Sequence, residues 1–122
     1  QLQPRQAVHW FHLGNVYVLL RKSKEAEEAY RKTIELEPDR ADGYRALAQF
    51  YLVSRRNIPE AVALARTAAD LDPSAPVFAL LGDLCDVNGN RNEAVRAMEQ
   101  AIRLDPANPR YRQRRMALSG SP

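Results

Sequence analysis

The sequence predicts an all-α fold, a solenoid of stacked helix pairs, from two observations. The first is an internal repeat, in which the spacing of large, small and turn residues between Trp10 and Pro38 returns twice further along the chain. The prolines that close the three copies, Pro38, Pro73 and Pro106, are 35 and then 33 residues apart, a period typical of stacked repeats. The second is the spacing inside each copy, where apolar residues recur at helical intervals.

Seven positions hold comparable residues in the three copies. In chain order they are Trp10, Tyr44 and Phe78; Leu13, Leu47 and Leu81; Gly14, Ala48 and Gly82; Tyr17, Tyr51 and Cys85; Ala26, Ala61 and Ala94; Tyr30, Ala65 and Met98; and Pro38, Pro73 and Pro106. Because the agreement extends over seven positions in register, it defines the repeat closely.

Each copy is expected to form two antiparallel helices. In the first copy, the stripe from Trp10 to Tyr17 follows the i, i+3, i+4, i+7 pattern of one helix face, and a second stripe begins at Ala26 after a polar run. We expect Gly14 to face Ala26, so that the two backbones approach closely. Such a pair leaves a second apolar flank, which another pair must cover. Trp10 should be buried, and Trp10→Ala should cost about 3 to 5 kcal/mol.

The helix boundaries follow from turn and capping residues. We expect helices at about 5–20, 24–36, 40–54, 59–71, 75–87, from Asn90 onward, and 109–118. Asp39 and Ser74 are expected to cap the third and fifth helices, and capping boxes are expected at Asn57 with Glu60 and at Asn90 with Glu93. In the seventh helix Tyr111 and Leu118 share one stripe, so this helix should cover the end of the stack.

These positions together resemble the tetratricopeptide repeat over about residues 7–108. The resemblance implies a right-handed stack of three helix pairs, at about 7–40, 41–74 and 75–108, and a capping helix at about 109–118, in a single domain spanning 1–122. Ala65, Cys85 and Thr33 depart from the residues common in the family, and Ala65 predicts a less fully packed middle pair. The style of the repeats resembles bacterial members.

The resemblance also implies that the first helix of each pair lines a concave groove that binds a partner protein or peptide. The site residues it points to are Phe11, His12, Asn15, Arg45, Gln49, Leu52, Leu80, Asp83 and Arg114. Amide side chains supply both donors and acceptors, as an extended peptide backbone requires. The predicted function is therefore a non-catalytic scaffold for protein interactions, against the alternative that these are only solvated helix positions.

Some family members grip the C-terminal carboxylate of heat-shock chaperones with a clamp of two lysines, two asparagines and one arginine. Only Asn15 matches that clamp, since the other positions hold Phe11, Ala46, Pro76 and Leu80. The resemblance therefore implies a mixed, largely apolar groove without this clamp.

Composition narrows the function classes. The chain has 45% hydrophobic and 27% charged residues and a net charge of +3, which describes a soluble globular protein. No apolar run is long enough for a membrane span. Since the sequence does not begin with Met, we expect a fragment or a processed chain.

Two alternative functions remain open. Four arginines, Arg110, Arg112, Arg114 and Arg115, follow the last repeat without any acid, and such a cluster can contact phosphates of nucleic acid or of a membrane surface. The slightly acidic body argues against a dedicated nucleic-acid binder. The other alternative is self-association through an apolar N-terminal flank around Leu2 and Val8.

Other side-chain groups look chemical but predict little. His9 and His12 are spaced to share a metal, but residues 1–24 contain no Cys, Asp or Glu as a third ligand. Asp83 and Asp86 form a carboxylate pair on one helix, and we interpret this pair as part of a solvent-exposed face. Cys85 falls on a stripe that is expected to be buried. There is no phosphate-binding glycine loop and no nucleophile with a base, so we expect neither an enzyme nor a bound cofactor or metal.

Overall fold

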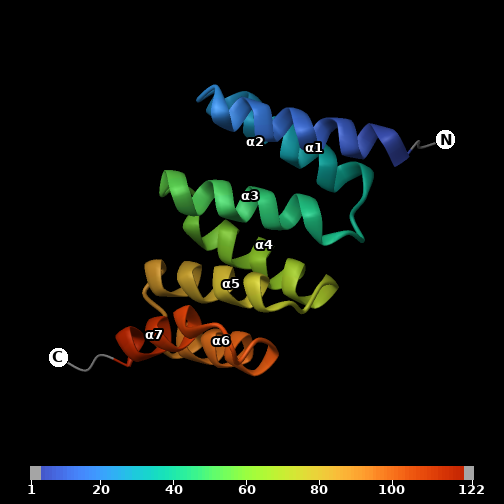
Figure 1. Ribbon diagram of the computed structural model, residues 1–122. Helices are drawn as coiled ribbons and strands as arrows, with labels where there is room; N and C mark the ends of the chain where they lie inside the picture. The colour runs from blue at the N-terminus through green and yellow to red at the C-terminus, as the bar shows by residue number, and fades with distance from the viewer. Residues whose placement is uncertain (1–3, 120–122) are drawn as a thin grey trace.

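The computed structural model describes residues 4–119 as seven helices with no strand among them (Figure 1). The helices are α1 (Pro4–Leu19), α2 (Ser23–Leu36), α3 (Ala41–Ser54), α4 (Ile58–Leu71), α5 (Ala75–Val87), α6 (Arg91–Leu104) and α7 (Pro109–Leu118). The expected boundaries differ from these by no more than a residue or two, because the apolar period and the turn residues define them. The all-α solenoid predicted from the repeat is confirmed.

The helices form three antiparallel pairs, α1 with α2, α3 with α4 and α5 with α6, stacked one on another (Figure 1). Consecutive pairs meet where α2 packs on α3 and where α4 packs on α5. The first helices also touch one another, α1 with α3 and α3 with α5. Since the second helices are not packed together in this way, the stack curves toward α1, α3, α5 and α7. We call this side the groove face.

Within each pair, a small residue on the first helix accommodates a side chain of the second. A Cβ added at Gly14 would lie 2.5 Å from Cε1 of Tyr30, and one added at Gly82 would lie 2.9 Å from Cε of Met98. Gly14 therefore faces the Tyr30 ring, and its expected approach to Ala26 stays a prediction. At the equivalent Gly82, the added Cβ would also lie 3.3 Å from the carbonyl oxygen of Ala94.

The middle pair has a different combination of residue sizes at these two positions. Ala48 stands at the position of Gly14 and Gly82, and Ala65 at the position of Tyr30 and Met98; both alanines have 0% exposed surface. Here two alanines take the places that a glycine and its large partner occupy in the other two pairs. The looser packing expected from Ala65 stays a prediction.

The helix caps were predicted less well than the helices. Asn90 accepts a hydrogen bond from the backbone N–H of Glu93 at 3.1 Å, as expected. The N-cap of α3 is Arg40 instead of Asp39, and neither Asn57 nor Ser74 caps with its side chain. Asn57 has a left-handed backbone with φ 50°, whereas a side-chain cap requires the extended region. The buried Ser74 hydroxyl has no hydrogen-bond partner in the described chain.

The two ends of the stack are covered differently. At the C-terminal end, α7 buries Tyr111 and Leu118 against the core and pairs Arg115 with Glu99 of α6 at 2.7 Å, so its expected capping role fits this packing. At the N-terminal end, Trp10 is only half-buried. The full burial expected for Trp10 is not observed, and its equivalents Tyr44 and Phe78 are half-buried too. Trp10→Ala should therefore cost less than the loss expected for a buried aromatic.

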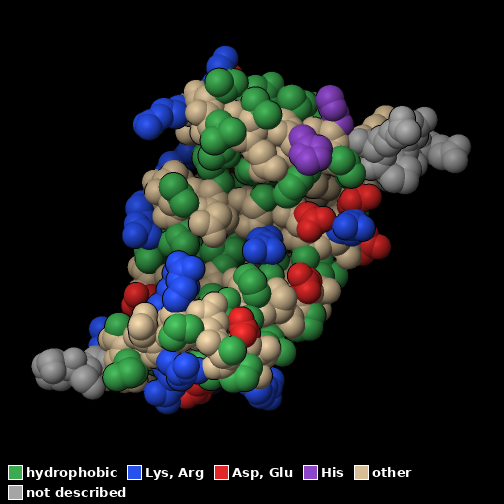
Figure 2. Space-filling model, viewed as in Figure 1, with side chains coloured by type: hydrophobic (Ala, Val, Ile, Leu, Met, Phe, Trp, Pro, Cys, Tyr) green, Lys and Arg blue, Asp and Glu red, His purple; other side chains and the backbone are tan. Residues whose placement is uncertain are grey.

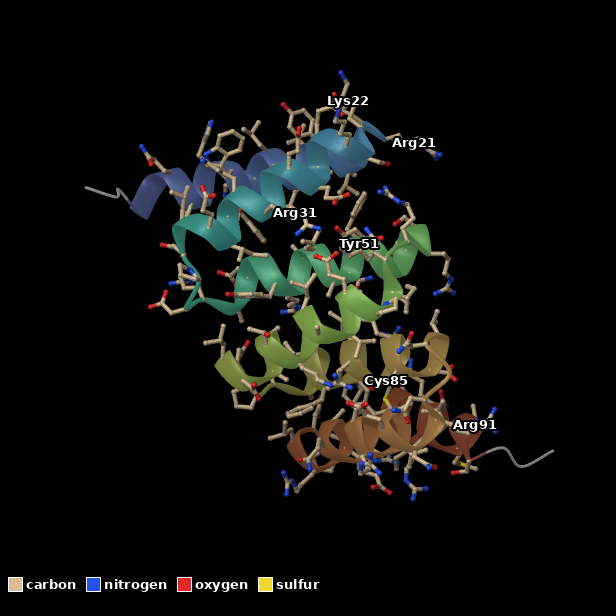
Figure 3. All side chains as sticks on the ribbon, turned by 180° about the vertical axis from the view of Figure 1, so that it is seen from behind. Arg21, Lys22, Arg31, Tyr51, Cys85 and Arg91 are labelled. Atoms are coloured by element: carbon tan, nitrogen blue, oxygen red, sulfur yellow. The ribbon has the colours of Figure 1, made fainter. Side chains whose placement is uncertain are left out.

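Ion pairs join successive helix pairs on the side away from the groove face. Arg31 of α2 pairs with Glu60 of α4 at 2.9 Å, and Arg66 of α4 pairs with Glu93 of α6 at 2.6 Å. The two arginines hold equivalent repeat positions, and so do the two glutamates. Arg31 also donates to the Tyr51 hydroxyl of α3 at 2.7 Å, and the two side chains lie together in Figure 3. We call this series of pairs the ion-pair ladder.

Candidate functional site

A large cavity on the groove face lies between α1 and α3 and has a volume of about 680 Å³. It is lined by Asn15, Val18, Leu19, Arg21, Ser23, Tyr30, Ala46, Gln49, Phe50, Val53 and Ser54. Leu19 and Val53 are 82% and 73% exposed, so large apolar side chains stand open to solvent at its rim. Exposed apolar surface beside amide groups is typical of a binding groove.

Asn15 is held in a fixed orientation within this cavity. The hydroxyl of Tyr30, which is buried on α2, donates a hydrogen bond to Oδ1 of Asn15 at 2.6 Å. The bond leaves the Nδ2 group of Asn15 with two donors that are available to a ligand. A pre-positioned donor beside apolar surface reduces the ordering cost of binding.

A second, smaller cavity of about 190 Å³ lies between the N-terminal halves of α1 and α3. It is lined by Ala7, Val8, Phe11, Thr33, Glu37, Arg40, Asp42 and Gly43. Val8 is 53% exposed and belongs to this groove-face cavity. The self-association flank expected around Leu2 and Val8 stays a prediction, and Leu2 lies outside the described residues.

The groove face changes character toward its C-terminal end. A cavity of about 360 Å³ is lined by Leu52, Val53, Arg55, Asp83, Asp86, Val87 and Arg114, and a neighbouring one of about 230 Å³ shares Asp83, Asp86 and Arg114. Asp83 pairs with Arg114 of α7 at 3.4 Å. Burial raises the pKa of the Asp83 carboxyl; Arg114 opposes this, and the nearby Asp86 adds to it. This end is charged, while the α1–α3 end is mostly apolar (Figure 2).

The predicted site residues are distributed unevenly over these four cavities. Those that line a cavity are Phe11, Asn15, Gln49, Leu52, Asp83 and Arg114. His12 and Arg45 are exposed helix positions outside them. Leu80 is only 5% exposed and belongs to the core, so it offers a ligand little surface. The repeat period places Leu80 on the groove side but does not reveal that neighbouring side chains cover it.

Sequence reasoning missed several lining residues of the large cavity. Arg21 comes from the turn between α1 and α2, where its backbone is left-handed with φ 59°, and Ser23 is the first residue of α2. Phe50 and Tyr30 contribute to the lining although they stand on packing stripes. A search restricted to one stripe of each first helix cannot find such residues.

The other chemically suggestive groups within residues 4–119 do not form a metal-binding cluster. No group of three or more possible metal ligands occurs there, and His9 and His12 are both exposed. Cys85 is 1% exposed and belongs to the core, and this burial, with a further contribution from Glu93, raises the pKa of its thiol to about 11. No described helix is long and apolar enough to cross a membrane.

The arginine cluster of α7 is partly engaged in contacts within the chain. Arg114 and Arg115 pair with Asp83 and Glu99, and Arg112 donates to the carbonyl of Pro106. Carboxylate partners reduce the positive charge that these arginines offer to phosphate groups. Nothing in this geometry favours the phosphate-binding alternative over a structural cap.

Comparison with known sequences identifies the family. A sequence model described as "Tetratricopeptide repeat" matches residues 6–76, and a second with the same description matches residues 75–108. The chain belongs to the tetratricopeptide repeat family. Members of this family are generally non-catalytic interaction modules. No curated protein matches the chain.

Solved tetratricopeptide structures share the fold. The first such domain of Spaghetti (RPAP3), bound to the HSP90 peptide SRMEEVD, superposes with a TM-score of 0.89 at 20% identity, covering 98% of this chain and 94% of that one. The second domain of human RPAP3, in complex with the HSP70 peptide SGPTIEEVD, gives 0.86 at 25% identity, covering 94% and 96%. YrrB, described as having an unusual peptide-binding site, gives 0.81 at 20% identity, covering 91% and 57%.

The carboxylate clamp of two lysines, two asparagines and one arginine is not formed at the expected positions of this tetratricopeptide stack. Phe11 and Ala46 are half-buried apolar residues, Pro76 is exposed and Leu80 is in the core. None of these four side chains can donate a hydrogen bond to a carboxylate. Resemblance to peptide-bound structures therefore concerns the backbone fold and not these contact residues.

Proposed function

We propose that the chain is a non-catalytic scaffold that binds a peptide or helix of a partner protein on its groove face. We further propose that the three helix pairs and α7 act as one domain, since the groove face runs along α1, α3, α5 and α7. The observation that carries the proposal is the cavity of about 680 Å³ between α1 and α3, with its exposed apolar rim and its fixed Asn15 amide.

The charge distribution on the groove face specifies the ligand further. Apolar side chains of the ligand would enter the α1–α3 cavity beside Leu19 and Val53. Asn15 and Gln49 would form hydrogen bonds with the ligand's backbone. Its polar end would lie near Asp83 and Arg114. This chemistry differs from that of a ligand gripped only by its terminal carboxylate. The peptide complexes of the RPAP3 domains support peptide binding as a use of this fold.

A displayed library of random peptides, selected on the immobilised chain, tests the proposal. Selected peptides should be rich in large apolar residues, and their affinity should fall at least about tenfold in Val53→Glu, because the change places a charge against an apolar ligand. The control is Leu104→Glu, which places the same charge on another exposed apolar side chain, 46% exposed, on α6 and away from the groove face.

Two results would overturn the groove assignment. One is a selection that yields no reproducible binder. The other is a set of binders that tolerate Val53→Glu and are lost with Leu104→Glu. Binding that disappears between low and moderate salt while ignoring Val53→Glu would instead indicate the arginines of α7.

A further inference from the structure

The chain contains two junctions between helix pairs. Each shows what covers the side of a first helix that faces the N-terminal end of the stack. At the first junction, a Cβ added to Gly43 of α3 would meet Ile34 and Thr33 of α2 at 2.8 and 3.2 Å. At the second, Val77 of α5 is fully buried in a cluster with Ala68 and Ala69 of α4. In both cases the preceding second helix lies on the same side of the first helix.

The residues packed at these junctions hold equivalent repeat positions. They are Gly43, Leu47, Phe50 and Tyr51 on α3, and Val77, Leu81, Leu84 and Cys85 on α5; all are buried except Phe50, which is half-buried. Leu47 and Tyr51 are 0% exposed, as is Leu84, while Cys85 is 1% exposed. The coverage of these positions by α2 and α4 is therefore nearly complete along the middle of each first helix.

The matching surface at the start of the stack is open. We call it the N-terminal face and define it by His9, Leu13, Val16, Tyr17 and Leu20 along α1 and its exit turn, together with Glu25 of α2. Val16 is 47% exposed, whereas its equivalents Phe50 and Leu84 are half-buried and 0% exposed. Leu20, one turn further on, is 58% exposed. Figure 2 shows hydrophobic side chains gathered over the end of the molecule formed by α1.

Glu25 gives this face an electrostatic feature as well as an apolar one. It occupies the repeat position of Glu60 and Glu93, the two carboxylates of the ion-pair ladder. Each of those accepts an arginine from the second helix of the preceding pair. Glu25 is exposed, and no ion pair joins it to another residue within 4–119. The N-terminal face thus presents one complete half of a junction.

The helices that cover the two internal junctions share a short pattern. Arg31 is followed at i+2 and i+3 by Thr33 and Ile34, and Arg66 is followed at the same offsets by Ala68 and Ala69. The arginine reaches the glutamate of the next pair, while the following residues pack on the first helix. This pattern describes the chemistry that fits the open half-junction.

We propose that the N-terminal face is a second binding site, distinct from the groove face, for an amphipathic helix with this pattern, contributed by another helix pair of the same kind. The arginine of that helix pairs with Glu25, and its small apolar residues cover His9, Leu13 and Val16. A second copy of this chain does not supply such a helix at its far end. There α6 carries Glu99 at the arginine position, and Glu99 is already paired with Arg115 of α7.

The test uses the full chain and a helix-stabilised synthetic peptide with the α4 sequence, residues 58–71, which already covers the equivalent face of α5. Trp10 is the only tryptophan of the chain, and its equivalent Phe78 on α5 packs beside the cluster that contains Ala68 and Ala69 of the preceding α4. Its emission should therefore shift to shorter wavelength in a saturable way as the peptide binds.

Three variants locate the site. Val16→Glu should weaken peptide binding about tenfold or more, because it places a charge in the apolar contact, whereas Val53→Glu on the groove face should leave it unchanged. A peptide carrying Arg66→Glu should bind about two- to fivefold more weakly, as expected for a partly exposed ion pair, and Glu25→Arg in the chain should restore its affinity. Thermal unfolding of each variant checks that the chain remains folded.

Several outcomes would overturn the proposal. An emission that does not saturate shows that the face has no helix site, and loss of binding with Val53→Glu instead of Val16→Glu assigns the peptide to the groove face. If the Arg66→Glu peptide binds the wild-type chain and the Glu25→Arg variant equally well, the peptide's residue 66 does not form an ion pair with residue 25. If sedimentation of the chain alone shows a dimer that Val16→Glu abolishes, the occupant is a second copy and not a foreign helix.

Discussion

Arg66 of α4 donates two hydrogen bonds to Glu93 of α6, from Nε at 2.8 Å and from Nη2 at 2.6 Å. The two side chains connect helices of different pairs, so this contact belongs to the junction between repeats and not to the folding of either repeat alone. The planar guanidinium meets both carboxylate oxygens, which is the strongest geometry available to such a pair.

A double-mutant cycle with Arg66→Gln and Glu93→Gln should give a coupling free energy of about 0.5 to 1 kcal/mol, the upper part of the range for exposed ion pairs. Urea unfolding of the four proteins measures it. The coupling should shrink at high salt, because Arg66 is half-exposed. A coupling indistinguishable from zero at low salt would show that the contact does not join the pairs energetically.

The lowered pKa of the Glu27 carboxyl predicts that the folded protein loses stability in mild acid. Burial alone would raise its pKa, but hydrogen bonds from Tyr51 and Arg31 and the charges of Arg31 and Arg56 outweigh burial, so the pKa of Glu27 is lowered. The unfolded chain then binds a proton at higher pH than the folded chain does. Stability from Glu27 is therefore present above the unfolded pKa of about 4.3 and is lost as pH falls below it.

In Glu27→Gln, unfolding free energy should be lower at pH 7 and should decline less steeply between pH 5 and pH 3. The comparison variant is Glu35→Gln, an exposed glutamate that pairs only with Lys32 at i−3. Parallel pH profiles for the wild type and Glu27→Gln would contradict the assignment.

Cys85 should react slowly with thiol reagents while the protein is folded. Its side chain is 1% exposed, and burial together with Glu93 raises the pKa of its thiol to about 11. Since the thiolate is the reactive form, both access and ionisation are suppressed near pH 8. Release of nitrothiobenzoate from Ellman's reagent should be slow in buffer and fast in strong denaturant. A native rate close to that of free cysteine would show that α5 and α6 open readily.

The pairing of residue sizes across each helix pair can be tested in the middle repeat. Ala65→Met should destabilise the protein by about 1 to 3 kcal/mol, because the enlarged side chain meets Ala48 in a filled core. Adding Ala48→Gly recreates the combination of Gly82 with Met98 and should recover part of that loss. The recovery must exceed any change in Ala48→Gly alone, which measures the glycine penalty in a helix. If the two changes are simply additive, the two positions do not share one space.

The sequence predicted the helices well because the evidence for them is local. Turn residues and the apolar period lie within each segment, and they located α5 and α7 to the residue. Contacts across helices were harder, since a stripe shows which residues face a neighbour but not which residue they meet. The Gly14 contact with Tyr30 and the burial of Leu80 both depend on the rotation of one helix against the next.

The groove residues were predicted only in part, for a related reason. Asn15 and Gln49 were found because they occupy the exposed stripe of the first helices. Arg21 escaped because a turn with a left-handed backbone carries it to the cavity. Ser74 and Asn57 show the same limit at helix ends, where residue type favours a cap but backbone direction decides whether one forms.

The composition of α7 determines where this solenoid can be lengthened. By the repeat spacing of Pro73 and Pro106, Tyr111 and Leu118 take the places of Phe78 and Cys85, but Arg115 takes the place of Gly82. Every second helix in the chain rests on a glycine or alanine at that position, and the guanidinium of Arg115 turns back to Glu99 instead. A designer who wants a longer array must insert new pairs before α7, because α7 cannot receive a partner helix.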